Sequence, residues 1–139
     1  MTDSAESSRR GTRLAHVGIA IRALDQSLPF YRDVLGLELT PLDDADGAHI
    51  TGLVAGETLV ELLEPDQLAS PVGKYLAKRG PGVHHVCFSV DDLDAMLARC
   101  RAAGVTLIDE SPRVGAEGKQ IAFLHPKSTG GVLVELSEY

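Results

Sequence analysis

The stretch Gly82-Val83-His84-His85-Val86-Cys87-Phe88-Ser89-Val90-Asp91-Asp92 decides the fold, because it restarts a pattern that first occurs near residue 16. From His85 the chain reads HVCFSVDDLDAMLARCRAAG, and from His16 it reads HVGIAIRALDQSLPFYRDVLG. At an offset of 69 the matching pairs are His16/His85, Val17/Val86, Ile21/Val90, Leu24/Leu93, Asp25/Asp94, Leu28/Leu97 and Arg32/Arg101. Self-similarity over a long period indicates duplicated supersecondary units that bury a shared core.

The two halves also end alike. TLVELLE at 58–64 answers VLVELSE at 132–138 at an offset of 74, so the second half carries about five extra loop residues. Each half therefore contributes one histidine and one glutamate at matching positions: His16 and Glu61, then His85 and Glu135. Two histidines and two glutamates are an inventory of metal ligands.

Hydrophobic periodicity gives each half the same order of elements. Alternation from Leu14 predicts a strand, with His16 and two small residues on one face and apolar residues on the other. Asp25 is expected to cap a helix that ends at Gly36, before strands at 37–42, 49–54 and 58–64. The second half is expected to contain a strand at 85–90, a helix from Asp92 to Gly104, and strands at 105–108, 119–124 and 131–137.

The predicted fold class is therefore α+β, with tandem βαβββ modules. Module 1 spans about 13–66, a connecting helix about 70–80, and module 2 about 82–139, within a single domain at 13–139. Ser70 as N-cap and Pro71 at the first helical position mark the connecting helix. The polar residues 1–12 are expected to form a disordered tail.

Composition excludes several classes of function. A net charge of −7 argues against general nucleic-acid binding, which needs a basic face. No apolar run approaches the roughly 18 residues of a membrane span, so no membrane partner is expected. Cys87 and Cys100 are expected to be reduced thiols, and the tail lacks the apolar segment of a secretory signal. We therefore expect a cytoplasmic protein.

Glu61 and Glu135 each lie within a run of leucine and valine. A carboxylate in a buried strand is costly unless it is paired or binds a metal, and the repeat brings both glutamates to both histidines. His85, rather than His84, aligns with His16, so His84 is expected to point to the helix side or the entrance. Such a set of two nitrogens and two oxygens suits Zn, Co, Ni, Mn or Fe(II), and the residues do not choose among them.

The paired modules with His…Glu…His…Glu resemble the vicinal oxygen chelate (glyoxalase/bleomycin resistance/dioxygenase) superfamily over about residues 13–139. Within it, three stretches look like the methylmalonyl-CoA epimerase family. They are VELLEP at 60–65, SPVGKYLAKRGPGVHHV at 70–86 and LIDESPRVGAEGKQIAFLHPKSTGGVLVEL at 107–136, of which HPKSTGGVL is the most specific. The resemblance implies a curved mixed sheet around a metal site.

It also implies a reaction and its residues. His16, Glu61, His85 and Glu135 match the metal positions of the family, with Co²⁺ favoured over Mn²⁺, Ni²⁺ or Zn²⁺. The reaction moves one proton at C2 of an acyl-CoA through an enolate, with one base on each face, and Glu135 matches one base. At the position of the other, a glutamate in the relatives, this chain has Ala45. Asp46 is the expected replacement, with Asp44 and His49 as alternatives.

For the coenzyme A phosphates, the same resemblance indicates Arg113, Lys119, Lys127 and the backbone around Ser128 in the loops of module 2. The partners implied are a small-molecule acyl-CoA and a second copy of the chain in a homodimer. Three alternatives share the fold: a glyoxalase I-type lyase acting on a glutathione hemithioacetal, an extradiol dioxygenase, and a non-catalytic resistance protein that binds a small molecule. The fourth ligand, Glu61, argues against the dioxygenase, which uses two histidines and one glutamate.

Overall fold

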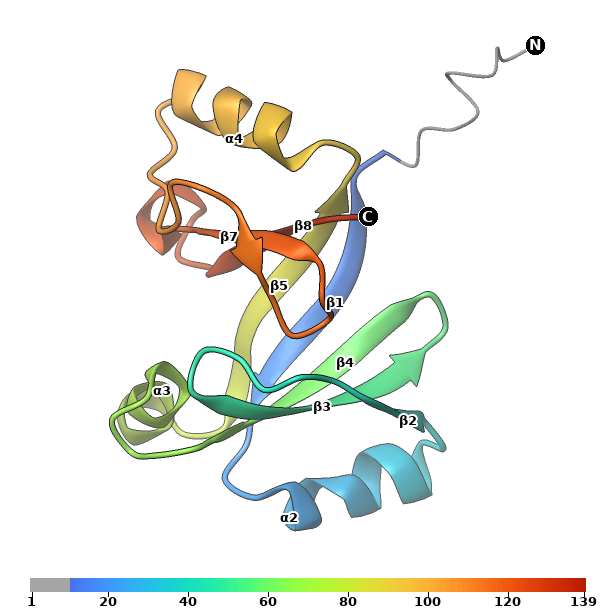
Figure 1. Ribbon diagram of the computed structural model, residues 1–139. Helices are drawn as coiled ribbons and strands as arrows, with labels where there is room; N and C mark the ends of the chain where they lie inside the picture. Colours follow the sequence, from blue (N-terminus) through green and yellow to red (C-terminus); the bar gives the residue numbers. More distant parts are fainter. Residues whose placement is uncertain (1–10) are drawn as a thin grey trace, which may run out of the picture.

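A computed structural model describes residues 11–139, and its backbone repeats one unit twice (Figure 1). The first unit contains β1 (Arg13–Ala20), α2 (Leu24–Leu28), the π-helical turn η1 (Pro29–Val34), β2 (Glu38–Pro41), β3 (Ala48–Ala55) and β4 (Thr58–Pro65). After α3 (Pro71–Arg79), the second contains β5 (Gly82–Val90), α4 (Leu93–Ala102), β6 (Arg113–Val114), β7 (Gln120–Leu124), the 3-10 turn η2 (Pro126–Ser128) and β8 (Val134–Glu138). The predicted tandem βαβββ order is confirmed. Most of the predicted tail, residues 1–10, lies outside the described residues.

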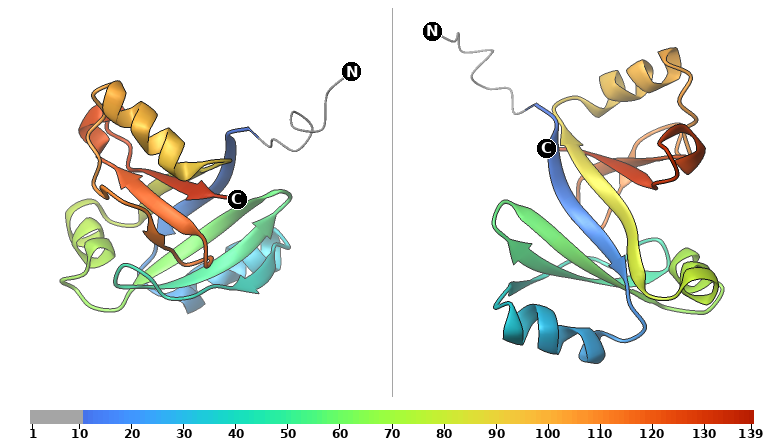
Figure 2. Two further views of the ribbon diagram at one scale, coloured as in Figure 1. Left: turned by 45° about the horizontal axis from the view of Figure 1, so that its top comes forward. Right: turned by 180° about the vertical axis from the view of Figure 1, so that it is seen from behind.

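All eight strands form one mixed sheet in the order β2-β3-β4-β1-β5-β8-β7-β6. β1 and β5 pair antiparallel at its centre, and each also pairs in parallel with the last strand of its own module, β4 or β8. The arms on either side of β1 and β5 curl toward each other, and α2 and α4 lie on the outside of the curl (Figures 1 and 2). The inner face of the central strands therefore lines a concave space.

The two outer helices, α2 and α4, each pack on the outer face of their own arm (Figure 1). Leu93 and Leu97 of α4 are buried against Leu136 of β8, and Leu24 of α2 packs on buried Leu62 of β4. The inner face is left to the histidines and glutamates, as the alternation along β1 predicts. No helix in the described part of the chain is long and apolar enough to cross a membrane.

The beginnings of the two outer helices correct one prediction. Asp25 is not an N-cap: the N-cap of α2 is Ala23, in extended conformation and without a side-chain cap. The backbone N–H of Leu24 instead donates to the Glu64 carboxylate of β4, at 2.8 Å. A carboxylate fixed on the adjacent strand satisfies the first orphan donor, so Asp25 is left in the first turn. By contrast Asp92 caps α4 and Ser70 caps α3, as predicted.

A second correction concerns the strand expected at 105–108, where the structure has only the isolated bridge between Leu107 and Leu124. The N–H groups of Ile108 and Asp109 both donate to the carbonyl oxygen of Phe123. The Asp109 carboxylate in turn accepts the N–H of Phe123, at 2.9 Å. The Asp109 side chain thus occupies the N–H of Phe123, which a regular strand pair would need for a backbone carbonyl. The strand that pairs with β7 is β6 instead.

Candidate functional site

The register of the central strands explains how the predicted ligands meet. On the inner face, Gly18 of β1 lies directly between Glu61 of β4 and His85 of β5. One pleat away, Cys87 of β5 lies between His16 of β1 and Glu135 of β8. The two rows are related by the duplication, since Gly18 answers Cys87 just as His16 answers His85. The structure therefore brings together all four residues that the repeat singles out.

Three donor atoms form a nearly regular triangle. His16 Nε2 is 3.0 Å from His85 Nε2 and 3.0 Å from Glu135 Oε1, and His85 Nε2 is 3.1 Å from the same oxygen. Ligands at about 2.1 Å from a metal and at right angles around it are separated by about 3.0 Å. Donor atoms of Glu61, His16 and His85 also lie within 4.8 Å of one another. The spacing fits one divalent cation.

The charge balance of the site fits a cation as well. Burial raises the pKa of Glu61 to about 8, against the attraction of His16. Glu135 is also buried, but contacts with His16 and His85 outweigh the loss of hydration and lower its pKa to about 2. His16 is held protonated, with a pKa of about 12, because its contacts with Cys87 and nearby glutamates outweigh its burial. The buried carboxylates thus favour positive charge beside them.

Two buried polar atoms of the set make no hydrogen bond: Nδ1 of His16 and Oε2 of Glu61, which lie 3.3 Å apart. A buried carboxylate oxygen without a partner carries a substantial free-energy cost. Bound divalent ions relieve this cost, because carboxylate and imidazole are ordinary ligands for such ions. His16, Glu61, His85 and Glu135 are therefore the residues that could hold the metal. Cys87 is buried beside them, and burial raises its thiol pKa to about 11, which favours packing over ligation.

Sequence reasoning missed Glu117, which reaches the site from the turn between β6 and β7. Its Oε2 lies 2.9 Å from His16 Nδ1, without hydrogen-bond geometry, and the contact with protonated His16 lowers the pKa of Glu117. A glutamate between glycines in a polar stretch looks like an exposed turn residue. The curl of the sheet places the β6–β7 turn over the first module.

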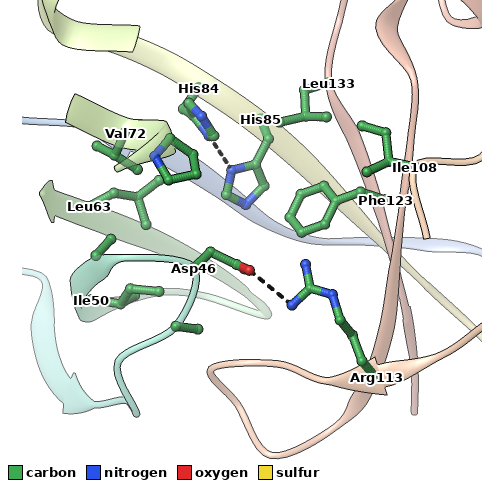
Figure 3. A pocket seen from close by; sticks show the side chains of 13 residues that line it. Asp46, Ile50, Leu63, Val72, His84, His85, Ile108, Arg113, Phe123 and Leu133 are labelled. Atoms are coloured by element: carbon green, nitrogen blue, oxygen red, sulfur yellow. Dashed lines mark hydrogen bonds and ion pairs between the residues drawn. The ribbon is translucent and has the colours of Figure 1, made fainter. Parts of the chain in front are cut away.

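Two connected cavities lie above the ligands. The inner cavity, about 30 Å³, is lined by His16, Glu61, His85, Glu117 and Glu135, together with Ala45 and Asp46. A cavity of this size is large enough to hold a water molecule. The apolar chamber, about 200 Å³, adjoins it and is shown in Figure 3. Its walls include Ile50, Leu63, Val72, Ile108, Phe123 and Leu133.

The three candidates for the second base lie in different places in the structure. Asp46 has a left-handed backbone (φ 54°) and lines both cavities, with its carboxylate 2.9 Å from Arg113 Nη1 across the chamber (Figure 3). Asp44 and His49 instead pair with each other at the exposed surface. Asp46 is thus the one of these three residues that faces the ligands.

The predicted coenzyme contacts do not form one cluster. Arg113 lies at the chamber, where it pairs with Asp46 and Asp109. Lys119 is on the other side of the inner cavity, 3.9 Å from the Glu117 carboxylate. Lys127 is exposed on η2, and the hydroxyl of Ser128 accepts the N–H of Thr106, so that side chain is already used in the fold. His84 lies against Tyr75 of α3, on the helix side as expected.

Comparison with known proteins identifies a family and several similar acyl-CoA epimerases. A family model described as the Glyoxalase/Bleomycin resistance protein/Dioxygenase superfamily matches residues 15–123. The methylmalonyl-CoA epimerase of Dictyostelium discoideum is 40% identical, over 91% of this chain and 78% of its own. The ethylmalonyl-CoA/methylmalonyl-CoA epimerase of Cereibacter sphaeroides is 38% identical, over 91% and 97%. A solved methylmalonyl-CoA epimerase in complex with methylmalonyl-CoA and NH4+ superposes with a TM-score of 0.87 at 41% identity, covering 91% of this chain and 94% of its own.

Proposed function

We propose that this chain, which belongs to the glyoxalase/bleomycin resistance protein/dioxygenase superfamily, is a methylmalonyl-CoA epimerase. It interconverts (2R)- and (2S)-methylmalonyl-CoA by moving one proton at C2. One observation carries the proposal: the buried His16–Glu61–His85–Glu135 set lies beneath an apolar chamber that opens beside it. Relatives that cover nearly the whole chain and bear this name support it.

In this proposal the four residues hold a divalent cation, for which Co²⁺ is our first candidate and Mn²⁺, Ni²⁺ and Zn²⁺ are alternatives. When bound, the ion supplies Lewis-acid stabilisation of the enolate oxygen, worth several kcal/mol. The triangle of donor atoms and the unpartnered Glu61 carboxylate oxygen support this assignment. The chain supplies the remainder of the chemistry through its carboxylates.

Inversion at C2 needs a base on one face and an acid on the other. Glu135 comes from β8, in module 2, whereas Asp46 comes from the β2–β3 loop, in module 1. We propose that one of these carboxylates removes the C2 proton, leaving the electron pair in the enolate, and that the protonated form of the other returns a proton to the opposite face. Asp46 lines the inner cavity beside Ala45, the position at which the family resemblance implies a glutamate, which supports its role.

The alternative activities are less well supported. The related proteins described above act, by their names, on methylmalonyl-CoA or ethylmalonyl-CoA, and one of them was solved with methylmalonyl-CoA bound. A metal-independent resistance protein would not need a buried set of four ligands. The ligand set does not separate a glyoxalase-type lyase from an epimerase, and the stretches SPVGKYLAKRGPG and HPKSTGG argue against the lyase. We further propose a cytoplasmic homodimer. Exposed Phe30, Val34 and Leu35 on η1 and just beyond it offer apolar surface for such an assembly.

The decisive experiment follows deuterium incorporation at C2 of methylmalonyl-CoA in D₂O, with the purified protein and with or without Co²⁺. We expect metal-dependent exchange that is lost in Glu135→Ala. Absence of exchange above background with Co²⁺, Mn²⁺, Ni²⁺ and Zn²⁺ would reject the function. The same protein would then be assayed with methylglyoxal and glutathione.

A further inference from the structure

We infer that Glu117 is a positioning residue for the metal site: its carboxylate accepts the Nδ1–H of His16, which leaves Nε2 of that ring to face the divalent cation. Glu117 is not one of the four residues that the repeat singles out. The inference rests on the part of the proposed function that places a cation on His16. It adds the group that fixes the orientation of the His16 ring.

The two nitrogens of the His16 ring face different groups. Nε2 belongs to the triangle of donor atoms, with His85 Nε2 and Glu135 Oε1 each 3.0 Å away. Nδ1 faces two other carboxylates, with Glu117 Oε2 at 2.9 Å and Glu61 Oε2 at 3.3 Å. A histidine that binds a metal through one nitrogen carries its proton on the other, and that N–H is ordinarily held by a carboxylate, a backbone carbonyl or water.

Glu61 and Glu117 therefore compete for the Nδ1–H of His16. Glu61 comes from the buried part of β4 and is one of the four proposed ligands, so with a cation bound its carboxylate is engaged by the ion. Glu117 is then the remaining acceptor among the residues that the structure describes. Within residues 11–139 Nδ1 makes no aligned hydrogen bond, although its distance to Glu117 is that of one. We expect the hydrogen bond to become aligned in the metal-bound protein.

The β6–β7 turn that carries Glu117 is held firmly in place. At its start Gly115 packs on the buried side chain of Ile121, where an added Cβ would lie 2.9 Å from Cδ1. Next to Glu117, the carbonyl oxygen of Ala116 accepts the N–H of Asp43, in the β2–β3 loop of module 1, at 3.0 Å. Two consecutive residues of the turn thus contact the first module, one through its backbone and the other through its carboxylate.

The duplication gives this turn a counterpart. β6 and β7 hold the places in module 2 that β2 and β3 hold in module 1, and the loop between each pair brings one carboxylate to the inner cavity. Asp46 of the β2–β3 loop faces the apolar chamber and pairs with Arg113. Glu117 of the β6–β7 turn faces His16 instead. The two equivalent loops therefore supply carboxylates for different tasks.

The other ligand histidine has a different partner. Nδ1 of His85 lies 3.0 Å from Nδ1 of His84, so with Nε2 of His85 on the cation its Nδ1–H is accepted by an imidazole. A carboxylate partner raises the basicity of a ligand histidine. The partner of His16 carries a negative charge and the partner of His85 does not. Loss of Glu117 should therefore weaken the bond from His16 to the metal and leave His85 unchanged.

The test combines calorimetric titration with Co²⁺ and NMR of the full chain loaded with Zn²⁺, with isotope-labelled histidines. In the parent protein we expect a downfield Nδ1–H signal of His16 that exchanges slowly with water. In Glu117→Ala this signal should be lost to exchange, and the Kd for Co²⁺ should rise by about 10–100-fold. The Nδ1–H signal of His85 is the internal reference, because its partner His84 is unchanged.

Two further variants make the comparison specific. Glu117→Gln keeps the size of the side chain and a neutral acceptor, so it should retain the His16 signal with a smaller rise in Kd. Glu57→Ala is the matched control, because Glu57 is an exposed glutamate that lines the same surface groove as Glu117. It removes the same charge without contact with a ligand, and its Kd for Co²⁺ should stay within about twofold of the parent value. Thermal unfolding with EDTA checks the fold of each variant.

These measurements need no substrate, so the inference and the proposed function can fail separately. A raised Kd together with the lost His16 signal, in a protein that shows no deuterium exchange, would uphold Glu117 and reject the epimerase. Unchanged Kd and signal in Glu117→Ala would overturn the inference at any level of activity. A raised Kd with the His16 signal intact would also overturn it, because Glu117 would then act on the cation directly. If the parent protein bound neither ion, the inference would fall together with the metal site.

Discussion

The imidazole of His85 occupies the space that a side chain at Gly18 would need: a Cβ built on Gly18 would lie 2.2 Å from Cε1 of His85. Gly18 lies directly opposite His85 in the β1–β5 pair, so the ring folds over the glycine. At the duplicated position, Cys87 has a side chain and packs beside His16. The two histidines are therefore held differently although their backbones repeat.

We predict that Gly18→Ala displaces the His85 ring and lowers affinity for Co²⁺ at least about tenfold, while overpacking costs about 1–3 kcal/mol of stability. Calorimetric titration with Co²⁺ and chemical denaturation measure the two effects. Gly82→Ala, on β5, is the control, because its Cβ would meet only Tyr75 Oη at an ordinary 3.5 Å. Equal Co²⁺ affinity in Gly18→Ala and the parent would show that His85 needs no such space.

The helix starts provide a second prediction. Glu64 accepts from Leu24 at the start of α2, and Glu138 accepts from Leu93 at the start of α4. α4 has a second cap in Asp92, whereas Ala23 gives α2 none. We therefore expect Glu64→Ala to cost about 1–2 kcal/mol in urea unfolding and Glu138→Ala less. Glu57→Ala, on the exposed β3–β4 turn, is the control. The reverse order of the two losses would contradict the capping argument.

Sequence reasoning predicted the fold, and the close approach of the four candidate ligands, because both follow from the repeat. Pairing His16 with His85, and Glu61 with Glu135, required only the two offsets and the alternation of strand faces. The start of α2 was mispredicted because its cap comes from β4, and local patterns do not record a partner that is distant in the sequence. For the same reason the 105–108 strand was wrong: Asp109 competes with the ladder through a hydrogen bond to Phe123.

Glu117 was beyond sequence reasoning for a related cause. Its place depends on how far the sheet curls, which sets what lies across the concave space.

Metal dependence gives a third prediction, in which one substitution changes the stability of the metal-free protein and its Co²⁺ affinity in opposite directions. Burial makes the Glu61 charge unfavourable without a cation, as its raised pKa shows. Glu61→Gln removes that charge at nearly constant size, so the metal-free protein should be at least as stable as the parent in thermal unfolding with EDTA. Its Co²⁺ affinity should nevertheless fall at least about tenfold. A less stable variant with unchanged Co²⁺ affinity would show a structural role for Glu61 instead.

The second base provides the last prediction, since two carboxylates of the inner cavity compete for the role. Asp46 and Glu117 both line it, but Glu117 lies against His16, whereas Asp46 faces the chamber and Arg113. A proton acceptor must reach C2, and in the proposed function the apolar chamber receives the acyl group. We therefore expect Asp46→Asn to slow deuterium exchange by roughly 10²–10⁴-fold with little change in Co²⁺ affinity.

Glu117→Gln should have a smaller effect on exchange and should change Co²⁺ affinity, because its contact is with a ligand. Asp44→Asn, which alters only the surface pair with His49, is the matched control. If Glu117→Gln abolished exchange at unchanged Co²⁺ affinity while Asp46→Asn remained active, the base would be Glu117. The proton would then be carried by the β6–β7 turn, and Asp46 would serve to hold Arg113 at the chamber.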